Sequence, residues 1–110
     1  LVDFWASWCQ PCMIELPNII NLYKTYKDNG FEIFGVSLDS EQEAWLKCIK
    51  DNKMDLAQVW DMEGSNPGQT ANMYNVTGIP HTVLVDRDGT IIDLNLRGEE
   101  LAAKLAEILK

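Results

Sequence analysis

The sequence predicts an α/β fold in a single domain, and two patterns carry this prediction. In the N-terminal half, two apolar runs rich in β-forming residues, 1–6 and 31–39, flank a long stretch of helical periodicity, 11–29. In the C-terminal half, two strand-like runs surround a tight turn and are followed by an amphipathic helix. The first pattern indicates a βαβ unit with parallel strands, and the second an antiparallel hairpin.

The first strand and helix are the most regular elements. Residues 1–6 have the composition of a buried strand with Asp3 as its one polar interruption. The helix over 11–29 should end at Gly30, and Pro17 inside it removes one backbone donor and is expected to kink it. The apolar residues that recur at helical spacing are Met13, Leu16, Ile20 and Tyr23.

The second strand leads into a second helix. Residues 31–39, FEIFGVSLD, are rich in β-forming residues. Ser40, with Glu43 three residues later, forms a capping-box pattern, which predicts that the helix starts there. The apolar face of this helix carries Trp45, Cys48 and Ile49.

The stretch that follows is less regular. Residues 55–61, DLAQVWD, fit a short strand, and the next residues, EGSNPGQ, have the composition of a loop. The dipeptide Asn66-Pro67 is a pattern that opens a short helix, here running to Tyr74.

The last elements are a hairpin and a helix. The runs 81–86 and 90–96 flank the turn Asp86-Arg87-Asp88-Gly89, and this close spacing predicts an antiparallel pair. The final helix should start near Glu99. Its predicted buried stripe consists of Leu101, Leu105, Ile108 and Leu109.

Length and charge narrow the function classes. We assign residues 1–110 to one domain with a single core. Nine basic and 17 acidic residues give a net charge of −8, and such a surface repels phosphate backbones and anionic membrane faces, so nucleic acid is excluded as a favoured partner. No apolar run approaches the roughly 20 residues that span a bilayer. The sequence lacks a starting methionine and opens inside a strand, so we expect a fragment of a longer chain whose N-terminal strands are missing.

The stretch WASWCQPCMIELP places Cys9 and Cys12 two residues apart at the strand-to-helix turn. A zinc site usually takes four Cys or His ligands, whereas the rest of the chain offers only Cys48 and His81. A structural disulfide across two intervening residues would constrain the unfolded chain very little. Two ordinary core thiols would not need the Trp-Cys-x-Pro-Cys setting. Cys48, on the apolar helix face, is interpreted as a buried, inert thiol.

A redox pair accounts for every residue of this stretch. Cys9 falls where unpaired backbone N–H groups and the positive end of the helix dipole stabilise a thiolate, and an exposed thiolate there is the attacking nucleophile of disulfide exchange. Pro11 suits the first helical turn. Cys12, one turn into the helix, is close enough to attack the mixed disulfide formed at Cys9.

Two separated motifs, LVDFWASWCQPC and GIPHTVLVDRDG, resemble the thioredoxin superfamily, and the longer pattern WCQPCMIELP is similar to its TlpA/ResA-type bacterial thiol–disulfide oxidoreductases. The resemblance covers essentially the whole chain. It implies the thioredoxin fold, with a central mixed sheet of four or more strands in the order 2-1-3-4, in which strands 3 and 4 are the runs 81–86 and 90–96. Helices lie on both faces, and an insert precedes the strand that follows Pro80. It also implies a cis peptide bond at Ile79-Pro80, facing the cysteines, where an extended substrate chain can pair with the backbone of Ile79.

The resemblance assigns roles to two acids. Asp3 is either a strand residue turned toward water or a buried carboxylate with a raised pKa that takes the proton of Cys12 through water, and the resemblance favours the second. Glu15 follows Cys12 by three residues and lies on the same side of the helix. It is either an ordinary exposed glutamate or, by resemblance, a residue that tunes the thiols or handles their protons.

The residues around the pair are assigned to substrate binding. Trp8 is expected to pack beside the cysteines, shield them and present a flat apolar surface to partners, with core packing as the alternative. His81 is interpreted as a partly buried strand residue, and otherwise would give the site pH sensitivity near neutrality. The substrate-binding set is Trp8, Gln10, Pro11, Ile79 and Pro80.

The predicted function is that of a thiol–disulfide oxidoreductase, in which Cys9 attacks a protein disulfide and Cys12 resolves the mixed disulfide. No metal or organic cofactor is expected. By resemblance, the partners are protein disulfides or thiols and a membrane dithiol carrier that restores the reduced form, and the setting is outside the bacterial cytoplasm. Three alternatives are a tryparedoxin-like cytosolic reductant, a peroxidase-type enzyme, and a non-catalytic module that keeps the fold to dock partners.

Overall fold

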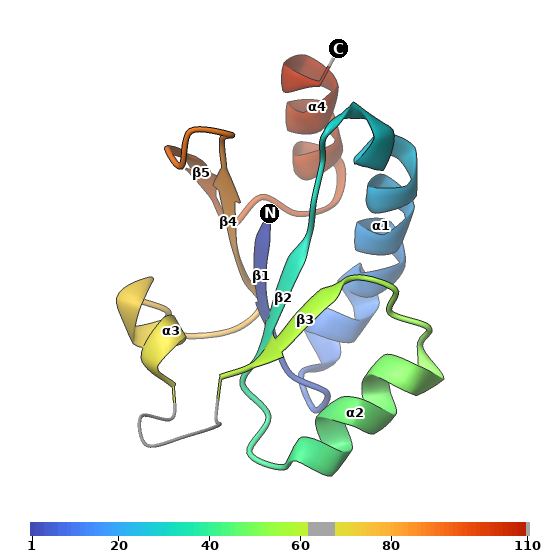
Figure 1. Ribbon diagram of the computed structural model, residues 1–110, viewed down its shortest axis with the longest axis vertical. Coiled ribbons are helices and arrows are strands. Elements are labelled where there is room, and N and C mark those ends of the chain that lie inside the picture. Colours follow the sequence, from blue (N-terminus) through green and yellow to red (C-terminus); the bar gives the residue numbers. More distant parts are fainter. Residues whose placement is uncertain (62–67, 110) are drawn as a thin grey trace.

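The centre of the fold is a five-stranded mixed sheet in the order β3-β2-β1-β4-β5 (Figure 1). The structure is a computed structural model that describes residues 1–61 and 68–109. The strands are parallel from β1 to β3, and β4 and β5 complete the sheet as an antiparallel hairpin next to β1. Their bounds are β1 (Val2–Trp5), β2 (Phe34–Ser37), β3 (Ala57–Trp60), β4 (His81–Val85) and β5 (Ile91–Leu94).

The predicted order of four strands is confirmed, since β2, β1, β4 and β5 lie side by side in that order. The short strand predicted within residues 55–61 is also confirmed, and it adds β3 at the edge of the sheet beside β2. The hairpin turn forms at Asp86–Gly89, where Gly89 takes a left-handed conformation with φ of +91°.

The first helix, α1 (Gln10–Tyr26), agrees with its prediction. It continues as a single 3-10 turn, η1 (Lys27–Asn29), and ends at Gly30, whose φ of +94° is the left-handed value that a glycine adopts readily. Pro17 lies inside the helix, as predicted.

The predicted capping box of the second helix is wrong. The helix α2 (Gln42–Asp51) has Glu41 at its N-cap, and that side chain makes no capping hydrogen bond. Because the helix starts later than the box requires, Ser40 lies outside the N-cap position and its hydroxyl is out of register with the first turn. The apolar face is confirmed, since Trp45, Cys48 and Ile49 pack against a buried cluster.

The short helix α3 (Gln69–Met73) has its N-terminal backbone capped from a distance. The Asp61 carboxylate accepts the backbone N–H groups of Thr70, at 3.0 Å, and Ala71, at 2.9 Å. These two donors belong to the first turn, which has no helical partner for them. The helix ends one residue before the predicted Tyr74, and the prediction that Asn66-Pro67 opens it falls outside the described residues.

The last helix, α4 (Gly98–Ile108), buries Leu101 and Leu105 as predicted, and Leu109 packs against the core from just beyond its end. Ile108 departs from the prediction and is 40% exposed. It lies in the last turn of α4, next to the C-terminal end marked in Figure 1.

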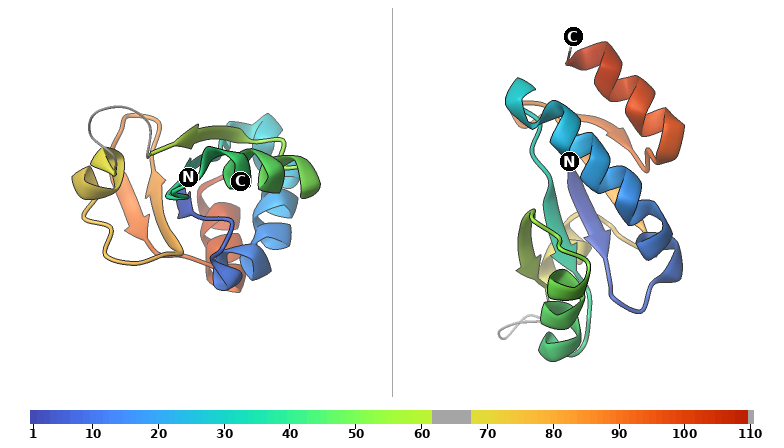
Figure 2. Two further views of the ribbon diagram at one scale, coloured as in Figure 1. Left: turned by 90° about the horizontal axis from the view of Figure 1, so that it is seen from below. Right: turned by 90° about the vertical axis from the view of Figure 1, so that its right-hand side faces the viewer.

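Helices cover both faces of the sheet (Figures 1 and 2). On one face, α1 and α4 enclose the cluster around Ile19, Ile33 and Leu101. On the same face, α1 and α2 enclose a second cluster that contains Trp5, Cys9 and Cys12. On the other face, α3 covers Phe4, Val36 and Val83. None of the helices in the described part of the chain is long and apolar enough to cross a membrane.

Candidate active site

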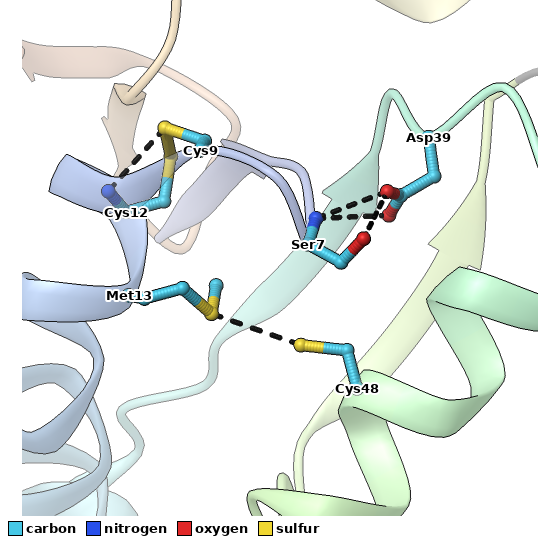
Figure 3. Close-up of a disulfide and its surroundings, with 6 residues drawn as sticks. All are labelled: Ser7, Cys9, Cys12, Met13, Asp39 and Cys48. Atoms are coloured by element: carbon cyan, nitrogen blue, oxygen red, sulfur yellow. Dashed lines mark hydrogen bonds between the residues drawn. A yellow bond between two sulfur atoms is a disulfide. The ribbon is translucent and has the colours of Figure 1, made fainter.

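The cysteine pair lies where β1 turns into α1. Cys9 is the N-cap residue of the helix, and its Sγ accepts the backbone N–H of Cys12 at 3.3 Å (Figure 3). The two residues form a disulfide, with their Cα atoms 5.3 Å apart. Pro11 lies in the first turn, as predicted. A sulfur in this position faces the unpaired N–H groups of a 17-residue helix, the setting that stabilises a thiolate.

Both cysteines are buried in this disulfide form, so the prediction of an exposed Cys9 is wrong here. Cys9 is 4% exposed and Cys12 is 7% exposed, because Trp5 and Leu16 belong to the same buried cluster and cover them. The sequence analysis predicted instead that the Trp8 side chain would shield the two cysteines. That indole is 67% exposed, which also rules out the alternative that it is a core residue.

The exposed surface beside the pair comes from residues between and before the cysteines. Trp8, Gln10 and Pro11 are all exposed, and Ile14, on the next turn of α1, is exposed as well. The role of Trp8, Gln10 and Pro11 in substrate binding stays a prediction. Ile14 was not among the residues predicted for this surface.

The two separated motifs meet in space. The Ile79-Pro80 peptide bond is cis, and Ile79 packs against the cluster that contains Cys9 and Cys12. Both residues of this dipeptide are partly buried. His81, which follows them, is the partly buried strand residue that the sequence predicted, with its ring edge-on to Phe4 at a centroid distance of 5.9 Å.

Asp3 has the raised pKa that was predicted. Its pKa increases from the ordinary value of 3.8 to about 6, chiefly because burial removes water from the carboxylate and secondly because the negative charge of Glu15 opposes its ionisation. A carboxyl group with this pKa exchanges protons near neutrality, and its role toward Cys12 stays a prediction.

Glu15 differs from an ordinary exposed glutamate. Its Oε1 accepts the backbone N–H of Gly98, at 2.8 Å, and the side-chain amide of Asn18, at 2.7 Å. Gly98 is the first residue of α4, so Glu15 links α1 to the N-terminus of another helix, where a negative charge is favourable. Its predicted influence on the thiols stays a prediction.

A polar cluster beside the pair was missed by the sequence analysis. Asp39, just after β2, is 1% exposed and accepts hydrogen bonds from Ser7 and Ser37. Ser7 lies in the loop that leads to Cys9. One signal could have found this cluster: the carboxyl ends of the parallel strands β1 and β2 meet at one edge of the sheet, which is where α/β folds place functional residues.

A second missed contact involves the neighbouring strand. Trp5 donates its indole N–H to Gln58 Oε1, at 3.1 Å. The Gln58 side chain lies over Gly35, where a Cβ atom would collide with Gln58 Oε1. Because Gly35 has no side chain, the Gln58 side chain can lie across it and reach the Trp5 indole. Gly35 also pairs with Asp3 in the register of β1 and β2.

Cys48 is partly buried rather than fully buried, and it lies outside the disulfide. Its Sγ is 3.7 Å from the Sδ of Met13 (Figure 3), and burial raises the pKa of the thiol, with the charge of Asp39 adding to the effect. Within residues 1–61 and 68–109, no group of three or more His, Cys, Asp or Glu side chains is placed to hold a metal ion.

Several known proteins that resemble this chain are named for thiol–disulfide chemistry. A family model described as thioredoxin-like matches residues 1–91. The chain is 31% identical over 109 residues to the thiol-disulfide oxidoreductase ResA of Bacillus thuringiensis subsp. konkukian, a match that covers 99% of this chain and 60% of that protein. It is 36% identical over 93 residues to the thiol:disulfide interchange protein HelX of Rhodobacter capsulatus, covering 84% of this chain and 48% of HelX. The chain therefore spans less than two thirds of the length of these curated relatives.

A solved structure agrees with these matches. The crystal structure of the thioredoxin domain of a thiol-disulfide oxidoreductase from Bacteroides vulgatus superimposes with a TM-score of 0.88 at 34% identity, over 99% of this chain and 77% of that one. Since the family model extends over most of the sequence and the structural likeness over nearly all of it, the chain belongs to the thioredoxin-like family.

Proposed function

We propose that this domain is a thiol–disulfide oxidoreductase that reduces disulfides of other proteins. The observation that carries the proposal is the position of Cys9, disulfide-bonded to Cys12 at the N-cap of α1, with its sulfur accepting a backbone N–H from the first helical turn. The names of the relatives support it, since ResA and HelX are called a thiol-disulfide oxidoreductase and a thiol:disulfide interchange protein.

The reaction takes two exchange steps, starting from the reduced pair. The Cys9 thiolate attacks one sulfur of the substrate disulfide, so that the substrate S–S bond breaks, a mixed disulfide forms at Cys9, and the other substrate sulfur leaves as a thiolate that takes up a proton. Cys12 then loses its proton and attacks the Cys9 sulfur. The Cys9–Cys12 disulfide forms, the second substrate thiol is released, and two electrons have passed to the substrate.

Asp3 is the group we assign to the proton of Cys12. Since its pKa is about 6, it is mostly ionised at pH 7 and accepts a proton with little cost. Trp8, Gln10 and Pro11 form the exposed surface on which the substrate would rest, and the backbone at Ile79-Pro80 would pair with an extended substrate segment.

The Cys9–Cys12 pair is the only redox group in this proposal, without a metal or organic cofactor. By resemblance to the TlpA/ResA group, we place the domain outside the bacterial cytoplasm, with a membrane dithiol carrier that returns the oxidised pair to the dithiol.

Two single substitutions test the proposed function. Cys9→Ser should abolish reduction of a protein disulfide such as that of insulin, because no attacking thiolate remains. Cys12→Ser should instead accumulate a mixed disulfide at Cys9, visible as a mass increase that a reductant removes. Cys48→Ser serves as the matched control and should reduce insulin at the wild-type rate. An active Cys9→Ser protein would refute the mechanism and favour a module that only docks partners.

A further inference from the structure

Asp39 is the centre of a polar network that the exchange reaction does not use directly. Its carboxylate accepts the backbone N–H of Ser7 on both oxygens, at 3.0 and 3.2 Å, and the Ser7 hydroxyl at 2.6 Å (Figure 3). The Ser37 hydroxyl donates a further hydrogen bond, also at 2.6 Å. A buried carboxylate is tolerated when its oxygens are satisfied in this way.

On one side, the network is attached to the strands of the sheet. The indole N–H of Trp60, in β3, donates to the backbone oxygen of Asp39 at 2.6 Å. One residue earlier, Leu38 donates its backbone N–H to the carbonyl of Trp5 at 2.8 Å. The backbone at Asp39 is therefore attached to two other strands, β1 and β3, and the carboxylate extends toward the loop from this fixed point.

On its other side, the network holds the start of the turn that presents Cys9. Ser7 lies two residues before Cys9, and the backbone N–H of Cys9 donates to the carbonyl of Ala6 at 3.1 Å. The loop between β1 and α1 is thus fixed at two points. Ser7 is bonded to Asp39, and the Cys9 N–H to the carbonyl of Ala6. Trp8 stands between these two attachment points.

We propose that Asp39 is a positioning residue for Cys9, whose carboxylate fixes Ser7 and thereby keeps the Cys9 sulfur at the N-cap of α1. The inference rests on the proposed function, since it assigns Asp39 to the placement of the attacking sulfur. The Cys9 sulfur accepts the Cys12 N–H only while Cys9 stays at the N-cap. Loosening the loop weakens this hydrogen bond, and the thiolate of the reduced protein loses part of its stabilisation.

A purely structural role for Asp39 would give a different result, and two serines distinguish the roles. Ser7→Ala and Ser37→Ala each remove one hydroxyl donor at 2.6 Å from the same carboxylate. Only Ser7 belongs to the loop before Cys9. Both variants leave the charges of Asp39, Asp3 and Glu15 in place, so electrostatic changes from these acids cancel in the comparison. Ser7→Thr keeps the hydroxyl and tests rescue.

The experiment measures the pH midpoint of Cys9 alkylation by iodoacetamide in the reduced protein, with the Cys9 peptide followed by mass spectrometry. Ser7→Ala should raise the midpoint, lowering the ionisation constant of the Cys9 thiol about fivefold, the size of effect that one ordinary hydrogen bond has. Ser37→Ala and Ser7→Thr should keep the wild-type midpoint, and thermal unfolding checks that all three variants fold.

Equal midpoints in Ser7→Ala and Ser37→Ala would overturn the inference, as would a Ser7→Thr protein that resembles Ser7→Ala. These results are separable from the proposed function, because the midpoint is measured without a substrate. A wild-type protein that fails to reduce insulin would refute the proposed function and leave the comparison of midpoints intact.

Discussion

Asp3, within β1, and Asp39, just after β2, are two acids of neighbouring parallel strands, and they differ in the hydrogen-bond donors around them. Asp39 is enclosed by donors, three contacts from Ser7 and one from Ser37. For Asp3, no side-chain hydrogen bond is found within the described residues, and burial raises its pKa to about 6. Burial alone therefore does not decide what an acid does. Donors make Asp39 a fixed anchor for the loop, whereas their absence leaves Asp3 able to exchange a proton near neutral pH.

Asp39→Asn should have the largest effect on stability of the substitutions that test this comparison. The amide keeps the size of the side chain, but its NH₂ group faces hydroxyl or backbone donors, so at least one charge-assisted hydrogen bond is lost and one buried donor is left unpaired. We expect the free energy of unfolding to fall by about 3–5 kcal/mol. Urea denaturation at pH 7 measures it.

Asp93→Asn is the matched control for this substitution. Asp93 lies exposed on the edge strand β5, where its one hydrogen bond among the described residues is from the backbone N–H of its neighbour Leu94. Its replacement should leave the urea midpoint unchanged. If Asp39→Asn were equally silent, the hydrogen bonds around Asp39 would contribute nothing to the fold, and its role as an anchor would have to be abandoned.

Asp3→Asn should act in the opposite direction and stabilise the protein at neutral pH. Between the ordinary pKa of 3.8 and the folded value of about 6, the unfolded chain ionises while the folded protein stays protonated, so stability decreases as the pH rises through this window. One unit of pKa difference is worth about 1.4 kcal/mol. Above pH 6 the ionised side chain therefore lowers the free energy of unfolding by about 3 kcal/mol, a loss that asparagine avoids.

The test compares urea denaturation of Asp3→Asn and wild type at pH 3.5, 5 and 7.5. The two proteins should be equally stable at pH 3.5, diverge at pH 5, and differ by about 2–3 kcal/mol at pH 7.5. Disulfide reduction by the variant should become slower as well, because Cys12 loses its proton acceptor. A pH-independent difference in stability would mean that packing, and not ionisation, separates the two proteins.

The elements that sequence predicted well depend on short-range patterns. The long helix α1, its stop at Gly30 and the location of Cys9 in the strand-to-helix turn all follow from residues a few positions apart. The meeting of Ile79-Pro80 with the cysteines needed a family resemblance, because no local rule relates segments about 70 positions apart.

What sequence did not predict is long-range hydrogen bonding. Ser7 and Asp39 are separated by 32 positions, and Glu15 and Gly98 by 83. Neither pair has a spacing that a periodic pattern could reveal. The prediction that Trp8 shields the cysteines was wrong for a related reason. An apolar residue next to a buried one is expected to be buried, but the turn at Cys9 directs the indole outward. The cysteine pair of the site is thus a local motif, whereas the polar contacts around it depend on the tertiary structure.

The smallest expected effect separates the two causes of the raised Asp3 pKa, which are burial and the charge of Glu15. Glu15→Gln keeps the oxygen that accepts the Gly98 N–H but removes the charge that opposes ionisation of Asp3. Because burial is the larger cause, the pKa of Asp3 should fall by only about half a unit. The loss of charge at the start of α4 should cost about 0.5 kcal/mol. The weaker repulsion of ionised Asp3 should return about 0.7 kcal/mol above pH 6, so the free energy of unfolding should hardly change there. Carbon-13 NMR of the Asp3 carboxyl group, titrated in both proteins, measures the difference.

Glu107→Gln is the control, since it removes the same charge near the other end of α4, where its carboxylate lies 4.0 Å from Lys104. It should leave the titration of Asp3 unchanged. An Asp3 midpoint that ignores Glu15→Gln would make burial the whole cause, and Glu15 would then act only as the link between α1 and α4. A midpoint that falls to the ordinary value would instead make the charge of Glu15 the main cause, and substrates or partners that neutralise Glu15 would then control how readily Asp3 takes up a proton.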